Sequence, residues 1–185
     1  MRNYLETSSK KLHIIDTSIR LFTTYGFHTA GVDLIVKESE IPKATLYNFF
    51  GSKEGLIEMC IVFQKSLLKE EVLAIIYSSR YYTSKDKLIE IMRLHVCFNS
   101  LYHLLLKAIF ETKLVYPKAY RMAVEYRKWL HHEIFDLIFS LETREAKPDA
   151  NMVLNLIDGL LLQALSSNSL DERDVVVGQF LKGVY

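Results

Sequence analysis

Apolar residues recur at intervals of three and four positions along nearly all of this 185-residue chain. That spacing places them on one face of an α-helix, and no segment shows the strict alternation of a half-buried strand. Half of the residues are apolar, so the chain has enough apolar surface to bury a core unaided. The pattern therefore predicts an all-α fold without internal repeats or disordered segments.

Breaks in the apolar pattern and capping residues set the bounds of the expected helices. Gly26 is suited to end the first helix, Pro42 to open the third, and Ser52 to cap the fourth. The helices are expected at about residues 9–25, 31–39, 42–50, 52–76, 86–99, 102–113, 117–141, 149–167 and 171–185. A hinge or linker is expected at 78–84, where the long fourth helix gives way to polar residues.

Charge and cysteine content indicate the cellular compartment. The 23 Lys and Arg residues nearly balance the 22 Asp and Glu residues. Cys60 and Cys97 form no CxxC motif and are too few for a disulfide framework, which predicts two buried thiols in a reducing cytoplasm. Residues 1–22 do not resemble a signal peptide, and no uninterrupted run reaches the roughly 18 apolar residues of a membrane span. We expect a cytoplasmic protein with no membrane segment.

The most informative stretch is IPKATLYNFFGSKEGL, residues 41–56. On a helical wheel, Leu46, Phe49 and Phe50 fall on one side and predict a core-facing stripe. The opposite side carries Ala44, Tyr47 and Asn48, and Lys43 and Thr45 flank it. Three short helices with a tight break before the third are the arrangement of a helix-turn-helix, whose third helix must enter a DNA major groove about 12 Å wide.

The polar face of this third helix suits contacts with double-stranded DNA. Ala44 permits close approach, Asn48 offers an amide to a base edge, and the hydroxyls of Thr45 and Tyr47 suit phosphates. The flanking lysine suits either kind of contact. Lys53 adds its charge to the free backbone N–H groups at the start of the fourth helix, and together they predict a separate phosphate site.

The stretch LFTTYGFHTAGVDLIVKESEIPKATLYNFFGSKEGLIEMC, residues 21–60, resembles the TetR family of transcriptional regulators. The segment LIDGLLLQAL, residues 156–165, is similar to the dimerisation helix of that family. The resemblance implies a homodimer in which residues 1–55 form a helix-turn-helix DNA-binding domain and residues 56–185 a helical ligand-binding and dimerisation domain. It also implies a repressor that leaves a pseudo-palindromic operator when a small-molecule effector binds.

Three positions, Glu40, Val36 and Gly31, depart from the family pattern, and the first and last of them keep a second hypothesis open. Glu40 stands in the turn where the family usually has Gly, and a non-Gly residue at positive φ costs on the order of 1 kcal/mol. Gly31 stands where the family often has Ser or Thr, so only its backbone is left for a phosphate contact. Residues 1–55 carry seven Lys or Arg against six Asp or Glu, which attracts DNA only weakly. The alternative is a helical dimeric binding or interaction module with a degenerate DNA-binding domain.

The remaining candidates lie in the second domain. Most of its aromatic residues are expected in the core, and a subset is expected to line a cavity for an apolar or aromatic effector. The expected effector contacts are Phe63, Phe98, Tyr102, Tyr120 and Trp129. Gly159 permits close helix approach near the C-terminus, which predicts a four-helix interface between two subunits. The expected interface residues are Leu156, Gly159, Leu160, Gln163, Val176 and Phe180.

No motif in the chain indicates an enzyme or a metal protein. GxSxG, GxGxxG, P-loop and HExxH sequences are absent, and the carboxylates are scattered in a pattern suited to solvated helix faces. The adjacent His131 and His132 diverge by about 100° on a helix, so they lack the spacing of zinc ligands. We therefore expect a non-enzymatic regulator without a bound metal or cofactor.

Overall fold

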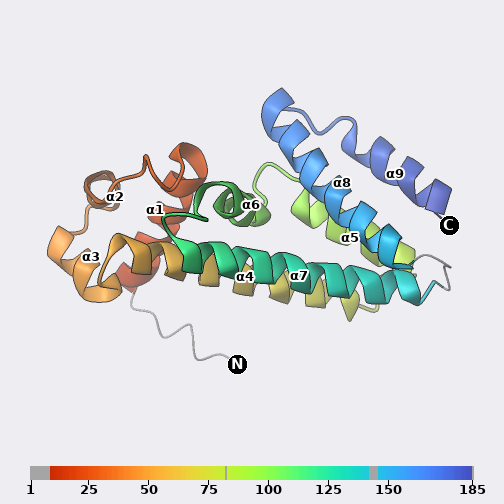
Figure 1. The fold of residues 1–185 in the computed structure, drawn as a ribbon, viewed down its shortest axis with the longest axis horizontal. Helices are drawn as coiled ribbons and strands as arrows, with labels where there is room; N and C mark the ends of the chain where they lie inside the picture. The colour runs from red at the N-terminus through yellow and green to blue at the C-terminus, as the bar shows by residue number, and fades with distance from the viewer. Residues whose placement is uncertain (1–8, 82, 142–145, 185) are drawn as a thin grey trace. The chain divides into compact units, whose positions relative to one another are not determined.

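The computed structural model describes residues 9–81, 83–141 and 146–184, and every regular element in these ranges is an α-helix (Figure 1). The predicted all-α fold class is thereby confirmed. The helices are α1 (Ser9–Tyr25), α2 (Val32–Ser39), α3 (Lys43–Phe50), α4 (Lys53–Ile76), α5 (Ser84–His95), α6 (Tyr102–Glu111), α7 (Pro117–Phe139), α8 (Ala146–Ser167) and α9 (Arg173–Val184).

Local caps fix several helix ends where the sequence indicated them. Gly26 follows α1 with a φ of +87°, and its N–H donates to the carbonyl of Phe22 at 2.9 Å. The hydroxyl of Ser52 accepts from the N–H of Gly55 at 3.0 Å and so caps the start of α4. Both predicted caps are confirmed.

The fifth helix begins and ends earlier than the predicted range 86–99. It begins at Ser84 because Thr83 and Asp86 form a capping box. The hydroxyl of Thr83 accepts from the N–H of Asp86 at 3.0 Å, and the N–H of Thr83 donates to the Asp86 carboxylate at 3.3 Å. The helix ends at His95, where the backbone turns away at Val96. The predicted start was wrong because the capping box lies outside the apolar pattern, and the predicted end was wrong because the helix stops at His95.

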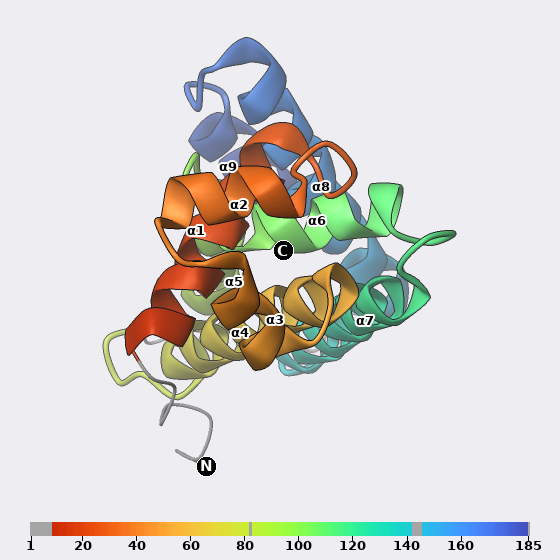
Figure 2. The ribbon, with the colours of Figure 1, turned by 90° about the vertical axis from the view of Figure 1, so that its left-hand side faces the viewer.

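Contacts divide the chain into two compact units, and the first combines Met1–Lys65 with Leu104–Val124. Within it α1 contacts α2 and α3, and α2 contacts α3 (Figure 2). Its core takes buried side chains from α1, α2, α3 and the start of α4: Ile14, Leu21, Phe22, Ile35, Leu46, Leu56 and Ile57. The rings of Phe22 and Phe27 stack with centroids 5.1 Å apart, which anchors the α1–α2 connection to this core.

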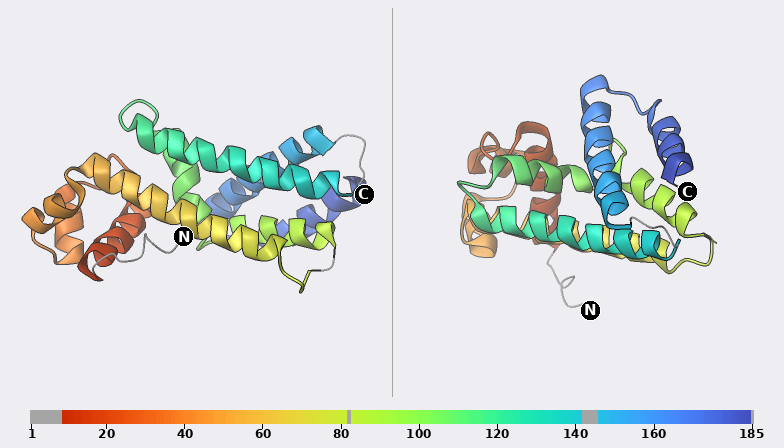
Figure 3. Two further views of the ribbon diagram at one scale, coloured as in Figure 1. Left: turned by 90° about the horizontal axis from the view of Figure 1, so that it is seen from below. Right: turned by 45° about the vertical axis from the view of Figure 1, so that its right-hand side comes forward.

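The second unit combines Ser66–His103 with Glu125–Tyr185. Within it α5 contacts α8 and α9, and the later part of α4 runs beside α7 (Figure 3). Arg93 of α5 pairs with Asp174 of α9 at 3.4 Å between Nε and Oδ1. The guanidinium of Arg173 donates to the carbonyl of Val96 at 3.0 Å, so polar contacts join the start of α9 to the end of α5.

The predicted domain boundary between residues 55 and 56 falls inside α4, which runs without interruption from Lys53 to Ile76. The compact units divide that helix after Lys65, and the first unit also takes in Leu104–Val124. The division into domains 1–55 and 56–185 stays a prediction. None of the helices in the described ranges offers an apolar stretch of the length that a bilayer crossing requires.

The two cysteines lie in different surroundings, and both are free thiols. Cys60 is completely buried in α4, whereas Cys97, in the α5–α6 connection, is only half-buried. The expectation of two buried thiols was therefore wrong for Cys97. Burial raises the pKa of both thiols above its ordinary value, which keeps them protonated and weakly reactive at neutral pH.

Candidate nucleic-acid interface

The turn between α2 and α3 holds a non-glycine residue in a left-handed conformation. Glu40 follows α2 with φ 54° and ψ 24°, which costs on the order of 1 kcal/mol for a residue with a Cβ. Just before it, the carbonyl of Ser39 accepts from Nε2 of His13 in α1 at 3.1 Å. The turn therefore has the left-handed conformation that favours Gly, and the backbone of Glu40 is strained in it.

The third helix buries one side and exposes the other. Leu46 is completely buried, and Phe49 and Phe50 are half-buried on the side predicted to face the core. The exposed residues are Lys43, Ala44, Tyr47 and Asn48, and Thr45 is half-buried. Tyr47 is 41% exposed. Gly51 ends the helix at φ +72° and donates its N–H to the carbonyl of Tyr47 at 2.8 Å.

The lysine at the start of α3 already has an anionic partner in the structure. Nζ of Lys43 donates to Oδ1 of Asp33, in the first turn of α2, at 2.7 Å. The hydrogen bond to Asp33 and its negative charge raise the pKa of Lys43. Asp33 was not among the residues selected from the sequence, and its charge offsets part of the attraction that Lys43 offers to a phosphate.

The starts of α2 and α4 hold the two other predicted phosphate contacts. Gly31 is the N-cap residue of α2, with φ −75° and ψ 163°, and no side chain caps that helix. Lys53 is the first residue of α4, and its Nζ donates to the carbonyl of His28 at 3.5 Å. Desolvation by burial lowers the pKa of Lys53. The contact with His28 brings the start of α4 next to the α1–α2 connection, close in sequence to Gly31.

The seven residues predicted to contact DNA belong to α3, to the N-cap of α2 or to the first residue of α4: Gly31, Lys43, Ala44, Thr45, Tyr47, Asn48 and Lys53. All of them lie in the first compact unit. Their assignment as DNA contacts stays a prediction.

The end of α6 contributes contacts to this unit that the sequence did not indicate. Oε2 of Glu111 accepts from the N–H of Phe27 at 2.7 Å, and Nζ of Lys107 donates to the carbonyl of Thr23 at 2.8 Å. A Cβ on Gly26 would lie 2.8 Å from Oε2 of Glu111 and would displace that carboxylate, in addition to the strain of a side chain at this positive φ. These partners are more than 80 residues apart in sequence, and local patterns carry no signal for such contacts.

A buried network of aromatic and polar side chains joins four helices of the second unit. The ring of Tyr126 lies 6.1 Å from His95, 6.0 Å from Tyr102 and 5.6 Å from Trp129, between centroids. The hydroxyl of Tyr102 donates to Asp158 of α8 at 2.7 Å. Asp158 also accepts from Arg127, with 3.1 Å between Nε and Oδ2. Burial raises the pKa of both tyrosines, so their hydroxyls stay protonated donors.

The predicted effector contacts fall in several places. Tyr102 and Trp129 both pack against the ring of Tyr126, whereas Phe98 is 43% exposed in the α5–α6 connection. Phe63 and Tyr120 are half-buried in the first unit. The role of these five residues stays a prediction, and Tyr102 already uses its hydroxyl within the protein.

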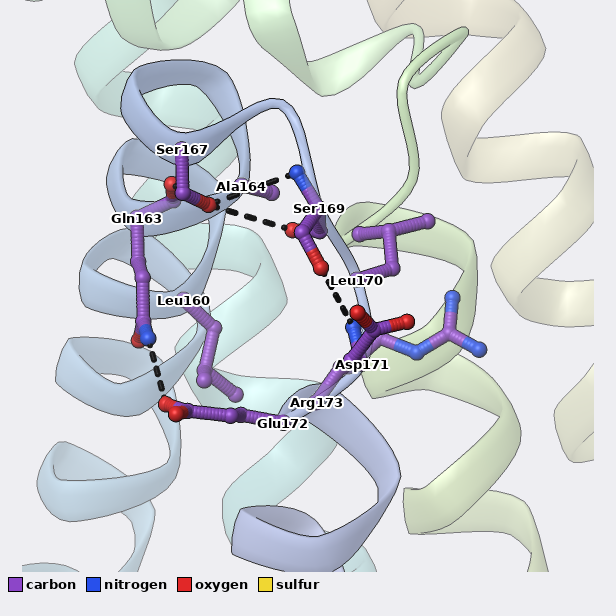
Figure 4. Close-up of a pocket in the computed structure, with 9 residues that line it drawn as sticks. All are labelled: Leu160, Gln163, Ala164, Ser167, Ser169, Leu170, Asp171, Glu172 and Arg173. Carbon is purple, nitrogen blue, oxygen red and sulfur yellow. Dashed lines mark hydrogen bonds between the residues drawn. The ribbon is translucent and has the colours of Figure 1, made fainter.

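The predicted dimer residues lie on α8 and α9, and two of them, Leu160 and Gln163, line a small pocket at the α8–α9 connection (Figure 4). This pocket has a volume of about 160 Å³, and Leu160, Gln163 and Ala164 line it from α8. Nε2 of Gln163 donates to the carboxylate of Glu172, which also lines the pocket, at 2.7 Å. Gly159 is exposed, and a Cβ there would meet nothing within 4 Å. Of the other predicted residues, Leu160 is buried and Leu156, Val176 and Phe180 are half-buried.

In the part of the chain that the structure describes, no group of three His, Cys, Asp or Glu side chains is placed to hold a metal ion. His95 and His103, which the sequence places eight positions apart, lie on different helices because α5 ends at His95. His132 lies 3.7 Å from the carboxylate of Asp136, and both side chains are exposed.

Comparison with known proteins agrees with this geometry. Residues 14–60 match the family model described as bacterial regulatory proteins, tetR family. An uncharacterized HTH-type transcriptional regulator of Bacillus subtilis, YxaF, is 49% identical over 47 residues, a stretch that covers 24% of this chain and 25% of that protein. The chain therefore matches about a quarter of this curated relative's length. The matched model describes regulatory proteins and not an enzyme family.

Solved structures share the fold over nearly the whole chain. A TetR transcriptional regulator from Legionella pneumophila superposes with a TM-score of 0.84 at 16% identity, covering 96% of this chain and 98% of that one. A candidate transcriptional regulator from Saccharomonospora viridis, solved in complex with choline, has a TM-score of 0.82 at 20% identity, covering 92% and 94%. The match at residues 14–60 shows a helix-turn-helix segment of the TetR family, and the solved structures show that the chain shares the fold of TetR-family regulators.

Proposed function

We propose that this protein is a cytoplasmic, homodimeric repressor that binds a pseudo-palindromic operator through α3 and releases it when a small molecule binds. The observation that carries the proposal is the face of α3, on which Ala44, Tyr47 and Asn48 are exposed while Leu46 is buried. Exposed tyrosine and asparagine beside a small residue suit a helix that must approach base edges closely. The TetR-family match over residues 14–60 supports the same conclusion.

An operator contact requires two such helices at a fixed separation. In a symmetric dimer, two recognition helices reach successive faces of the major groove about 34 to 36 Å apart. The outer faces of α8 and α9 support the proposal of a dimer, because four large apolar side chains are exposed there: Met152, Leu162, Leu165 and Val175. Gly159 on the same helix leaves room for a partner helix to pack closely.

The effector is proposed to be a small molecule with an apolar or aromatic body, bound in the second unit. The aromatic side chains of Tyr102, Tyr126 and Trp129 support this choice, because such rings supply most of the apolar lining of ligand sites. The related Saccharomonospora viridis structure holds choline. Effector binding changes the operator affinity only to the extent that the effector prefers one of two conformations of the dimer. A difference of a few kcal/mol between the effector's binding free energies to the two conformations is sufficient.

Selection of bound duplexes from a random DNA pool tests the proposal. We expect the full chain to enrich an inverted repeat, and Tyr47→Ala to abolish binding to it without changing dimer mass or helicity. The matched control is Tyr77→Ala, which removes a tyrosine that is 81% exposed beyond the end of α4. Retained binding by Tyr47→Ala would contradict the assignment of α3. No enrichment from a folded dimer would instead favour the interaction module with a degenerate DNA-binding domain.

A further inference from the structure

The side chain of Lys53 is held by two groups of the first unit before any DNA is bound. Its ammonium donates to the carbonyl of His28 at 3.5 Å and lies 6.0 Å from the centroid of the Tyr116 ring. Lys53 is half-buried. An ammonium has three N–H donors, so the contact with His28 leaves two of them for a phosphate.

Tyr116 belongs to the short connection between α6 and α7, and both its N–H and its carbonyl are hydrogen-bonded to the backbone. Its N–H donates to the carbonyl of Thr112 at 2.8 Å, and its own carbonyl accepts from the N–H of Tyr120 at 3.1 Å. Its ring stacks on the imidazole of His28 with centroids 5.8 Å apart. Backbone hydrogen bonds therefore hold Tyr116 on both sides, and stacking on the imidazole of His28 holds its ring.

The residue whose carbonyl receives Lys53 is held from the end of α6. Nε2 of His28 donates to the carbonyl of Glu111 at 2.8 Å, and the carboxylate of Glu111 accepts from the N–H of Phe27 at 2.7 Å. Glu111 is the last residue of α6. Tyr116 is thus one partner of Lys53, and both Tyr116 and Glu111 hold His28, the other partner.

We propose that Tyr116 is a positioning residue for DNA binding, which acts by holding the ammonium of Lys53 at the start of α4 in place for a phosphate. The proposal rests on the proposed function, because it needs Lys53 to contact DNA. A lysine side chain loses much rotamer freedom when it is fixed on a phosphate, and prior positioning removes part of that loss from the binding step. An aromatic face holds an ammonium by cation–π attraction without neutralising its charge.

Binding of the full chain to a duplex carrying the enriched inverted repeat, measured over a range of salt concentrations, tests this role. We expect Lys53→Gln to weaken binding by about 3-fold to 10-fold and to make the slope of log affinity against log salt shallower by nearly one. Tyr116→Leu should reproduce most of both changes, and Tyr116→Phe, which keeps the ring, should bind like the unmodified chain. Tyr25→Leu is the matched control, because Tyr25 is an exposed tyrosine at the end of α1 in the same unit and belongs to none of the proposed sites.

A double variant separates positioning from damage to the fold. In a chain that already carries Lys53→Gln, adding Tyr116→Leu should cause no further loss of affinity. The inference is overturned if Tyr116→Leu binds like the unmodified chain, if its loss persists in the Lys53→Gln background, or if Lys53→Gln itself changes nothing. In all three cases the unmodified chain still binds DNA and the proposed function stands. If the unmodified chain binds no duplex, the proposed function fails and this inference fails with it.

Discussion

Lys43 at the start of α3 donates from Nζ to Oδ1 of Asp33 at 2.7 Å, so the proposed recognition helix begins with a cation whose nearest anion belongs to α2. The Asp33 side chain is 87% exposed, which leaves its carboxylate able to repel an approaching phosphate. In the proposed complex, Lys43 exchanges this carboxylate for a DNA phosphate or base. The pair therefore limits what Lys43 contributes to binding.

Replacing Asp33→Asn should tighten binding to DNA. The change removes a negative charge beside the proposed interface and frees Lys43, so we expect about a 3-fold to 10-fold gain in duplex affinity at low salt. The gain should shrink as salt is added, because exposed charges are screened. Fluorescence anisotropy with a labelled duplex measures it.

Glu38→Gln is the matched control for this change. It removes the same charge from the same helix, but Glu38 pairs with Arg20 of α1 at 3.2 Å and not with α3. Equal gains from Asp33→Asn and Glu38→Gln would show that only net charge matters and that Lys43 has no special part.

The N-terminal helices were predictable because their ends are encoded locally. The first helix ends at Tyr25 as predicted, because Gly26 adopts the positive φ that its position at the end of an apolar pattern indicates. The buried and exposed sides of α3 likewise follow from a spacing of 3.6 residues per turn. These signals lie within one or two turns of the residues that they describe.

Contacts made over long distances in sequence could not be predicted in this way. The carboxylate of Glu111 and the ring of Tyr116 reach the α1–α2 connection and Lys53 from more than 60 residues away. The pairing of Lys43 with Asp33 was missed for a different reason. Both residues count toward the net charge of residues 1–55, but the sequence could not place them side by side. Only the angle between α2 and α3 brings them together.

Glu40→Gly should stabilise the protein by about 1 kcal/mol, because glycine adopts the left-handed conformation of this turn without the clash of a Cβ. Glu40→Ala keeps the Cβ and should bring no such gain. Urea denaturation measures both free energies of unfolding. Both variants remove the same charge, so they should improve DNA affinity equally. A gain in stability from Glu40→Ala as large as that from Glu40→Gly would show that charge repulsion, and not φ, was the cost.

Gly31→Ser should strengthen the start of α2. Gly31 has φ −75° and ψ 163°, a conformation that serine adopts freely, and a Cβ there meets nothing within 4 Å. The new hydroxyl caps free N–H groups of α2, and we expect a gain of a few tenths of a kcal/mol over glycine in the free energy of unfolding. Gly31→Ala is the control, because it adds the Cβ without a cap and should be less stable than Gly31→Ser. Equal stability of the serine and alanine variants would contradict the capping argument.

Acid should weaken the second unit through His95. This residue is completely buried, its Nδ1–H donates to the carbonyl of Ile91 at 2.7 Å, and its Nε2 accepts from the hydroxyl of Tyr126 at 2.7 Å. Burial lowers the pKa of His95 to about 4, from 6.5. Between pH 6.5 and pH 4 the unfolded chain therefore binds a proton that the folded chain does not. The free energy of unfolding should fall by about 3 kcal/mol across that window and show no such dependence above pH 7.

Variants at two histidines identify the source of this pH dependence. His95→Gln keeps a polar side chain opposite Tyr126 but cannot be protonated, so its free energy of unfolding should vary less between pH 6.5 and pH 4, whatever its absolute stability. His132→Gln is the control, because His132 is exposed on α7 and should leave the profile of the unmodified chain unchanged. Urea denaturation at a series of pH values provides the measurement. An unchanged slope in His95→Gln would mean that another group takes up the proton, and the buried imidazole would then have no part in the acid sensitivity of the protein.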